Sequence, residues 1–135
     1  MYKKSNNFLT LYEYNLPTMK KGFLLLFVIG MLYGCEAIFV ENISNATVTI
    51  LAPTEGTTIN SGEVNFNWNA VNDAESYQIQ IATPSFTNAS QVVLDTIITK
   101  TSFSKNITIG NYQWRVKAIN SDYQTNYTTT SFEVQ

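Results

Sequence analysis

The residue types that carry most protein chemistry are nearly absent from this chain. It has 135 residues, no histidine and a single cysteine, Cys35. Without histidine, the Ser-His-Asp and Cys-His nucleophilic systems are excluded, and the commonest transition-metal ligand is missing. Carboxylates remain as candidates: Asp73 and Glu75 are close in the sequence, and Glu55 and Glu63 lie in neighbouring predicted turns.

These carboxylates allow two kinds of chemistry. Two carboxylates that flank a sugar can hydrolyse a glycosidic bond, and a hard cation prefers oxygen ligands. A domain of this size, however, offers no deep cleft that would raise a carboxyl pKa, and the dense ligand spacing of a calcium loop is missing. We therefore interpret the four as solvated charges and predict no catalytic residue, no metal site, no cofactor and no enzymatic activity.

Aromatic residues in predicted loops offer a binding surface instead. Tyr123 and Tyr127 lie in the polar segment 120–127, and Phe86 lies in the segment 83–88. A tyrosine flanked by Asn, Gln and Asp presents an apolar ring with a polar rim, as sugar-binding surfaces do. Tyr123 and Tyr127 are therefore candidate ligand contacts, with a purely structural role as the alternative, and we expect Phe86 to fold back over the core.

An export signal precedes Cys35. The positively charged segment Met19–Gly22 is followed by the apolar run 23–34, which is too short to span a bilayer. A basic segment, an apolar stretch of this length and a small residue before the cleavage point are typical of a secretory signal peptide. We predict a signal peptide over 19–34, with Met19 as the true start and 1–18 as an upstream extension or a mis-called start.

The residues around the cysteine resemble a bacterial lipobox. Leu32-Tyr33-Gly34 stands directly before Cys35, although Tyr33 occupies a position where lipoboxes usually have a small residue. The resemblance implies that the Cys35 thiol is acylated with chains such as palmitate, and that the protein is anchored in a cell envelope, at the outer membrane. The alternative is that Cys35 merely follows a buried helix. Residues 36–46 show no sustained period and are predicted to be a tether.

Charge and length constrain the exported part further. From Cys35 onward there are four basic and nine acidic residues, a net charge of −5. Nucleic-acid binding needs clustered Lys and Arg, so we expect no nucleic-acid partner. The remaining hundred or so residues suffice for one domain, and a lone cysteine leaves that domain without an internal disulfide.

From Thr47 onward the chain alternates with period two, interrupted by Gly, Pro, Asn and Asp at short intervals. The pattern predicts seven strands, near 48–52, 64–68, 77–81, 92–98, 101–109, 112–118 and 129–134. The strand 92–98 alternates least cleanly and is predicted to lie at an edge. Short strands without room for crossover helices favour an all-β, antiparallel sandwich over 47–135. The predicted structural core includes Phe66, Trp68, Tyr77, Ile79, Tyr112, Trp114 and Val116.

Four segments of this domain resemble the fibronectin type III family. They are Phe66-Asn67-Trp68, Ala74–Ile81, Gly110–Asn120 and Ser131–Val134. The spacing of Tyr112, Val116, Ala118 and Asn120 is similar to the family's Tyr-x-x-x-Val-x-Ala-x-Asn pattern, and the version with Trp114-Arg115-Val116 resembles modules in surface lipoproteins of Bacteroidota-type bacteria. The resemblance implies a seven-stranded immunoglobulin-like sandwich in which the Tyr112 hydroxyl bonds to nearby backbone.

Modules of this family act mainly as spacers or binding platforms, so the resemblance is weak on function. It implies a non-catalytic binding or spacer module, with glycan capture beside a polysaccharide-uptake apparatus as one hypothesis. The alternative is a structural or protein-docking subunit of an envelope complex. That role would use an exposed sheet edge or the outward residues Gln78, Gln80, Gln113, Arg115 and Lys117.

Overall fold

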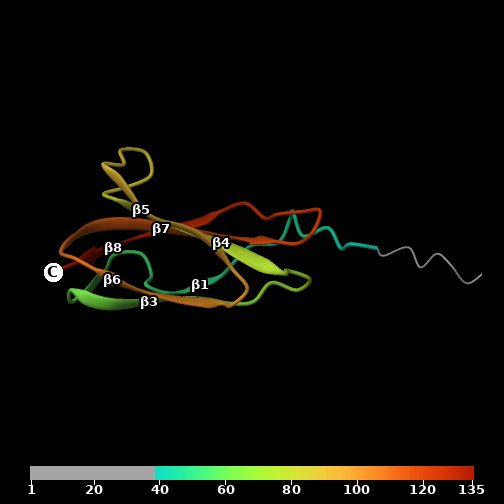
Figure 1. Cartoon of the computed structure of the whole chain (residues 1–135), viewed down its shortest axis with the longest axis horizontal. Coiled ribbons are helices and arrows are strands. Elements are labelled where there is room, and N and C mark those ends of the chain that lie inside the picture. Colours follow the sequence, from blue (N-terminus) through green and yellow to red (C-terminus); the bar gives the residue numbers. More distant parts are fainter. Residues whose placement is uncertain (1–38) are drawn as a thin grey trace, which may run out of the picture. The chain divides into compact units, whose positions relative to one another are not determined.

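The computed structural model describes residues 39–135, so the predicted signal peptide and Cys35 lie outside the described residues. The described part is built from β-strands (Figure 1). The eight strands are β1 (Ile50–Ala52), β2 (Thr57–Ile59), β3 (Gly62–Trp68), β4 (Ser76–Thr83), β5 (Gln91–Ile98), β6 (Ser102–Ile107), β7 (Gly110–Ile119) and β8 (Thr128–Val134). Nothing in this part of the chain is a helix long and apolar enough to cross a membrane.

The strands form two sheets that face each other across one core (Figure 1). The three-stranded sheet has the order β1-β3-β6, and the five-stranded sheet has the order β2-β8-β7-β4-β5. The predicted all-β sandwich is therefore confirmed. The strand β5 lies at the edge of its sheet, as its uneven alternation predicted.

The predicted count of seven strands is wrong, because β2 was not expected. Its three residues pair in parallel with β8, from Thr57 opposite Phe132 to Ile59 opposite Val134. This is also an exception to the predicted antiparallel pairing. Three residues are too few to show an alternation, so β2 exists only because β8 supplies a free edge for it.

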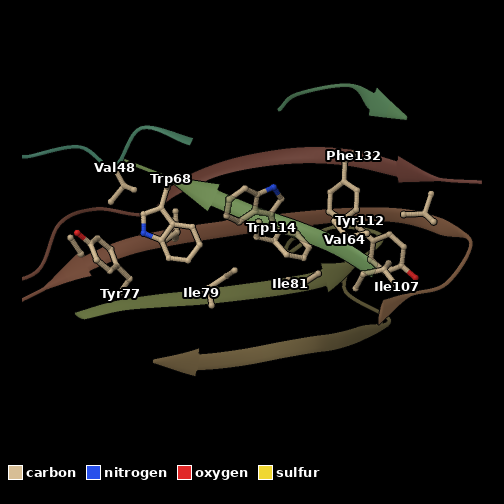
Figure 2. Close-up of a cluster of buried hydrophobic side chains, with 14 of the residues drawn as sticks. Val48, Val64, Trp68, Tyr77, Ile79, Ile81, Ile107, Tyr112, Trp114 and Phe132 are labelled. Atoms are coloured by element: carbon tan, nitrogen blue, oxygen red, sulfur yellow. The ribbon is translucent and has the colours of Figure 1, made fainter. Parts of the chain in front are cut away.

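The core is formed by the inward faces of both sheets. Along β7 every second residue from Tyr112 to Ala118 is buried, and the intervening side chains are half-buried. All seven residues predicted as structural core are buried. Phe66 of β3 packs edge-on against Trp114 of β7, with ring centroids 5.1 Å apart, and this contact joins the two sheets. Figure 2 shows Trp114 within the cluster of buried side chains, together with Trp68 and Ile81.

Polar atoms of the aromatic core are mostly satisfied. The indole Nε1 of Trp114 donates to the carbonyl of Pro53 at 3.1 Å, which fixes the turn after β1 against the opposite sheet. The hydroxyl of Tyr112 donates to the carbonyl of Thr108 at 3.0 Å, which is the bond that the family resemblance implied. Among the described residues, Trp68 Nε1 is buried without a hydrogen-bond partner.

One hydrophobic residue of the predicted strand 101–109 is not inside. Ile109 is 72% exposed, because β6 ends at Ile107 and the chain turns before Gly110. Gly110 has φ +154°, a conformation that L side chains rarely adopt, and an added Cβ would lie 3.4 Å from the ring of Tyr112. The turn therefore requires glycine at this position.

The segment before β1 packs on the domain. Ile43, which lies within the predicted tether, is 4% exposed and belongs to the core cluster. The side chain of Asn120 donates to the carbonyl of Glu41 at 2.9 Å. At least these residues are part of the folded domain, N-terminal to the boundary at Thr47 that the sequence suggested. The segment that precedes β1 lies at the end of the domain opposite to the C-terminus (Figure 1).

Candidate functional site

The outward side of the five-stranded sheet carries an ordered array of polar side chains. Gln78 and Gln80 point outward from β4, and Gln113, Arg115 and Lys117 point outward from β7, because the inward positions alternate with them. We call these five residues the outer face. All five are half-buried. The sequence predicts these residues as a docking surface. The antiparallel register of β4 and β7 places Gln80 opposite Arg115 and Gln78 opposite Lys117.

Hydrogen bonds fix the amide side chains of this face. The Nε2 groups of Gln78 and Gln80 each donate to one carboxylate oxygen of Asp95 on β5, both at 2.7 Å. The Oε1 of Gln80 accepts a hydrogen bond from Nε of Arg115 at 2.7 Å. Asp95, Gln80 and Arg115 thus form a chain of bonds across three strands, which holds the guanidinium in one orientation.

Two aromatic rings lie close to the guanidinium of Arg115. The Arg115 Cζ lies 4.1 Å from the ring centroid of Phe86 and 4.3 Å from that of Tyr127. The Nζ of Lys117 lies 4.8 Å from the same tyrosine ring and donates to Oε1 of Gln124 at 2.7 Å. Stacking of a cation on an aromatic face contributes about 0.5–1 kcal/mol at an exposed site. Arg115 therefore contacts two aromatic rings in addition to the hydrogen bond at its Nε.

The expectation that Phe86 folds back over the core is wrong. Its ring lies on Arg115, an outward residue, and its backbone N–H donates to Oε1 of Gln113 at 3.0 Å. The segment after β4 therefore bends over the outer face. Arg115 of β7 is a partner for the Phe86 ring outside the core. The two residues are far apart in the sequence, so the sequence alone does not predict their contact.

The two candidate tyrosines lie in different surroundings. Tyr127 is half-buried against the cations of the outer face, and burial raises the pKa of its phenol, with Arg115 partly opposing the shift and Asp95 adding to it. The phenol is therefore a neutral donor and acceptor at physiological pH. Tyr123 is 36% exposed, and its backbone N–H donates to Oδ1 of Asn120 at 2.8 Å. It thus belongs to the end of the domain where the N-terminal segment packs.

The carboxylates singled out in the sequence are dispersed. Glu55 accepts hydrogen bonds from the Thr130 hydroxyl and the Ser131 N–H, at 3.1 and 2.8 Å, and so fixes the turn before β2 to β8. Glu63 is exposed on β3 rather than in a turn. Asp73 and Glu75 are exposed between β3 and β4. Within residues 39–135, no three His, Cys, Asp or Glu side chains are grouped closely enough to hold a metal ion.

Two surface hollows lie away from the outer face. One of about 590 Å³ is lined by Ser61, Gly62 and residues 106–109, and another of about 650 Å³ is lined by residues of 97–104. Both open beside β6, and no residue of the outer face lines either of them. The outer face is therefore separate from these two hollows.

Of the comparisons with known proteins, the one with solved structures bears on the fold. No protein-family model matches the chain, and no curated protein matches it. Among solved structures, it is similar to the fibronectin(III)-like modules of Clostridium thermocellum CbhA, with a TM-score of 0.50 and 12% identity over 66% of this chain and 96% of that chain. An Fn3-like protein from Clostridium thermocellum has a TM-score of 0.46 and 18% identity, over 66% and 88% of the two chains. The similarity to the CbhA modules supports a fibronectin type III-like fold, and identities this low establish nothing beyond the fold.

The sequence identified the five residues of the outer face and Tyr127, but not their partners. Asp95 and Phe86 complete the site, from β5 and from the segment that follows β4. A weak signal for Asp95 was available, since it is the one charged residue of an edge strand that is mostly apolar. Its pairing with Gln78 and Gln80 depends on the register of β4 and β5, which the sequence leaves open.

Proposed function

We propose that this protein is a lipid-anchored, non-catalytic module of a bacterial cell envelope that captures a glycan on the outer face. The observation that carries the proposal is the half-buried array of amides and cations, fixed by hydrogen bonds and bordered by Phe86 and Tyr127. Sugars are bound by surfaces that combine aromatic rings with amide and charged groups at fixed positions. A fibronectin type III-like fold is consistent with a binding or spacer role.

The anchoring part of the proposal rests on the sequence before the domain. The basic segment, the apolar run and Cys35 resemble a lipoprotein signal, and more than one acyl chain is needed for durable attachment to a membrane. Metabolic labelling with a palmitate analogue should mark the intact protein, and Cys35→Ala should abolish the label. A labelled Cys35→Ala variant, or an unlabelled wild type that stays in the cytoplasm, would contradict the anchor.

The binding part is tested with the intact protein in detergent on a glycan array. Tyr127→Ala and Tyr123→Ala form a matched pair, because only Tyr127 contacts the cations of the outer face. Binding should fall at least tenfold in Tyr127→Ala and stay within about twofold of wild type in Tyr123→Ala. Circular dichroism checks that both variants fold. Equal losses in the two variants would place the site at the end of the domain instead, and recovery of shortened glycan chains would contradict a non-catalytic role.

A second candidate function is a spacer or docking subunit without a small ligand. The ends of the described domain lie at its opposite poles, as a spacer requires (Figure 1). The edge strand β5 also exposes Val92 and Ile97, which are 58% and 61% accessible. Absence of binding to every glycan by a folded wild type, with a specific envelope partner that is lost in Ile97→Asp, would favour this role over capture.

A further inference from the structure

We propose that Arg115 binds the carboxylate of an acidic polysaccharide, so that the ligand class is a polyuronate. The inference rests on the proposed function and specifies its ligand. It is based on polar groups of the outer face whose side chains are held in place by one hydrogen bond and whose other polar atoms have no protein partner among the described residues. Each of the relevant side chains is held at one end and has free polar atoms at the other.

Arg115 is the clearest case. Its Nε donates to Gln80, and its Cζ lies over the rings of Phe86 and Tyr127, 4.1 and 4.3 Å from their centroids. Within the described residues, Nη1 and Nη2 donate to no protein acceptor and the residue forms no ion pair. A guanidinium edge that is fixed but unpaired matches the two oxygens of a carboxylate, which it binds with two parallel hydrogen bonds. Because the orientation is already fixed, little conformational entropy is lost when the ligand binds.

The neighbours add donors and acceptors for sugar hydroxyls. Gln113 accepts from the Phe86 N–H through Oε1, which leaves its Nε2 unused among the described residues. Gln78 donates through Nε2 to Asp95, which leaves its Oε1 unused in the same part of the chain. A hydroxyl both donates and accepts, so it can bond to either group. A peptide lacks such regularly repeated hydroxyls, and this is why the geometry points to a polysaccharide and not to an acidic peptide.

The charges near Arg115 favour an anion only when it is in direct contact with the outer face. Lys117 is two residues from Arg115 on the same strand, roughly 7 Å along it. Asp95 faces the same array, but both of its oxygens accept from glutamine amides. The exported chain as a whole has a net charge of −5, so no long-range field attracts a polyanion. Recognition must therefore come from direct contact with the guanidinium.

The test measures binding of the intact protein in detergent by calorimetry. The probes are polygalacturonate, alginate and hyaluronate, each beside its carboxyl-reduced polymer, with poly-glutamate as the peptide control. We expect at least one polyuronate to bind and its reduced form to bind at least tenfold more weakly. Arg115→Gln should lose at least tenfold, and Arg115→Lys, which keeps the charge without the planar guanidinium, should lose at least threefold. Lys100→Gln removes the same charge from the exposed turn between β5 and β6 and should stay within twofold.

Several results would overturn the inference. Equal affinity for a polymer and its carboxyl-reduced form would exclude recognition of the carboxylate, and a loss in Lys100→Gln equal to that in Arg115→Gln would mean unspecific attraction. Tighter binding of poly-glutamate would exclude the polysaccharide. If the variants fail to fold, competition with the wild type decides the same question. Free galacturonate should then displace the bound polyuronate, whereas galactose, which lacks the carboxylate, should not. Binding of neutral glycans alone would refute this inference and leave glycan capture intact, whereas binding of no glycan would refute both.

Discussion

Replacing Asn120 with alanine should destabilise the domain by about 2–3 kcal/mol, because this side chain joins three segments at one end of the sandwich. Its Nδ2 donates to the carbonyls of Glu41 and Asp73, at 2.9 and 3.3 Å. Its Oδ1 accepts from the N–H groups of Tyr123 and Asp122, at 2.8 and 3.3 Å. The N-terminal segment, the β3–β4 loop and the β7–β8 loop are thus held by one residue that is 6% exposed.

The magnitude follows from these four bonds. A typical hydrogen bond contributes about 1 kcal/mol net, and the two at 3.3 Å are expected to contribute less than the two short ones. The backbone bond from the Asn120 N–H to the Tyr123 carbonyl does not involve the side chain and remains. Since small domains are stable by roughly 5–15 kcal/mol, the variant should still fold.

Urea unfolding of the intact protein, followed by tryptophan fluorescence, measures this change. Asn126→Ala is the control, because Asn126 is exposed in the same loop and a surface substitution usually changes stability by less than about 0.5 kcal/mol. Asn120→Asp keeps an acceptor for Tyr123 but directs a carboxylate oxygen at two carbonyls, so it should cost at least as much as alanine. A change below about 0.5 kcal/mol in Asn120→Ala, or full stability in Asn120→Asp, would refute this account of the three segments.

Three further outcomes can be checked on the same protein. Tyr112→Phe removes the hydroxyl that donates to the carbonyl of Thr108 and should lower the free energy of unfolding by about 1 kcal/mol, measured with urea. An unchanged free energy of unfolding would mean that this hydrogen bond does not stabilise the domain. Trp114→Ala should cost about 3–5 kcal/mol, since the side chain is fully buried, and a cost below about 1 kcal/mol would contradict its place in the core. Burial raises the pKa of Tyr127, so the folded state keeps a proton that the unfolded chain releases near pH 10. The contribution of this phenol to stability should therefore be constant below that pH and fall above it. The alkaline fall should be smaller in Tyr127→Phe, and an unchanged pH profile would show that the phenol environment is the same in both states.

The fold was predictable because local alternation and global burial agree over most of the chain. In β3, β4 and β7 every second residue is apolar, which predicts the positions that point inward. Two sheets packed face to face bury these apolar sides in one core. The prediction failed where an element has no pattern of its own. The strand β2 depends on the free edge of β8, and Ile43 packs in the core from a segment without a period.

The candidate site was predictable only in part, for a related reason. Alternation assigns Gln80, Arg115 and Lys117 to the outward side whatever their neighbours are. It does not say that Asp95 lies across from Gln80, nor that Phe86 and Tyr127 both contact the guanidinium of Arg115. These contacts join residues that are far apart in the chain, so they exist only once the strand register and the loop paths are set.

The amino-acid sequence by itself determined the side-chain alternation, the absence of histidine chemistry and the single cysteine behind an apolar run, because each of these is a property of composition or of neighbouring residues. Only the tertiary structure decided the eighth strand, the hydrogen-bonded amides and the stacked arginine. The physical reason is that strand pairing and side-chain stacking are interactions between distant segments, and a change of register by one residue would turn every outward side chain of the strand inward.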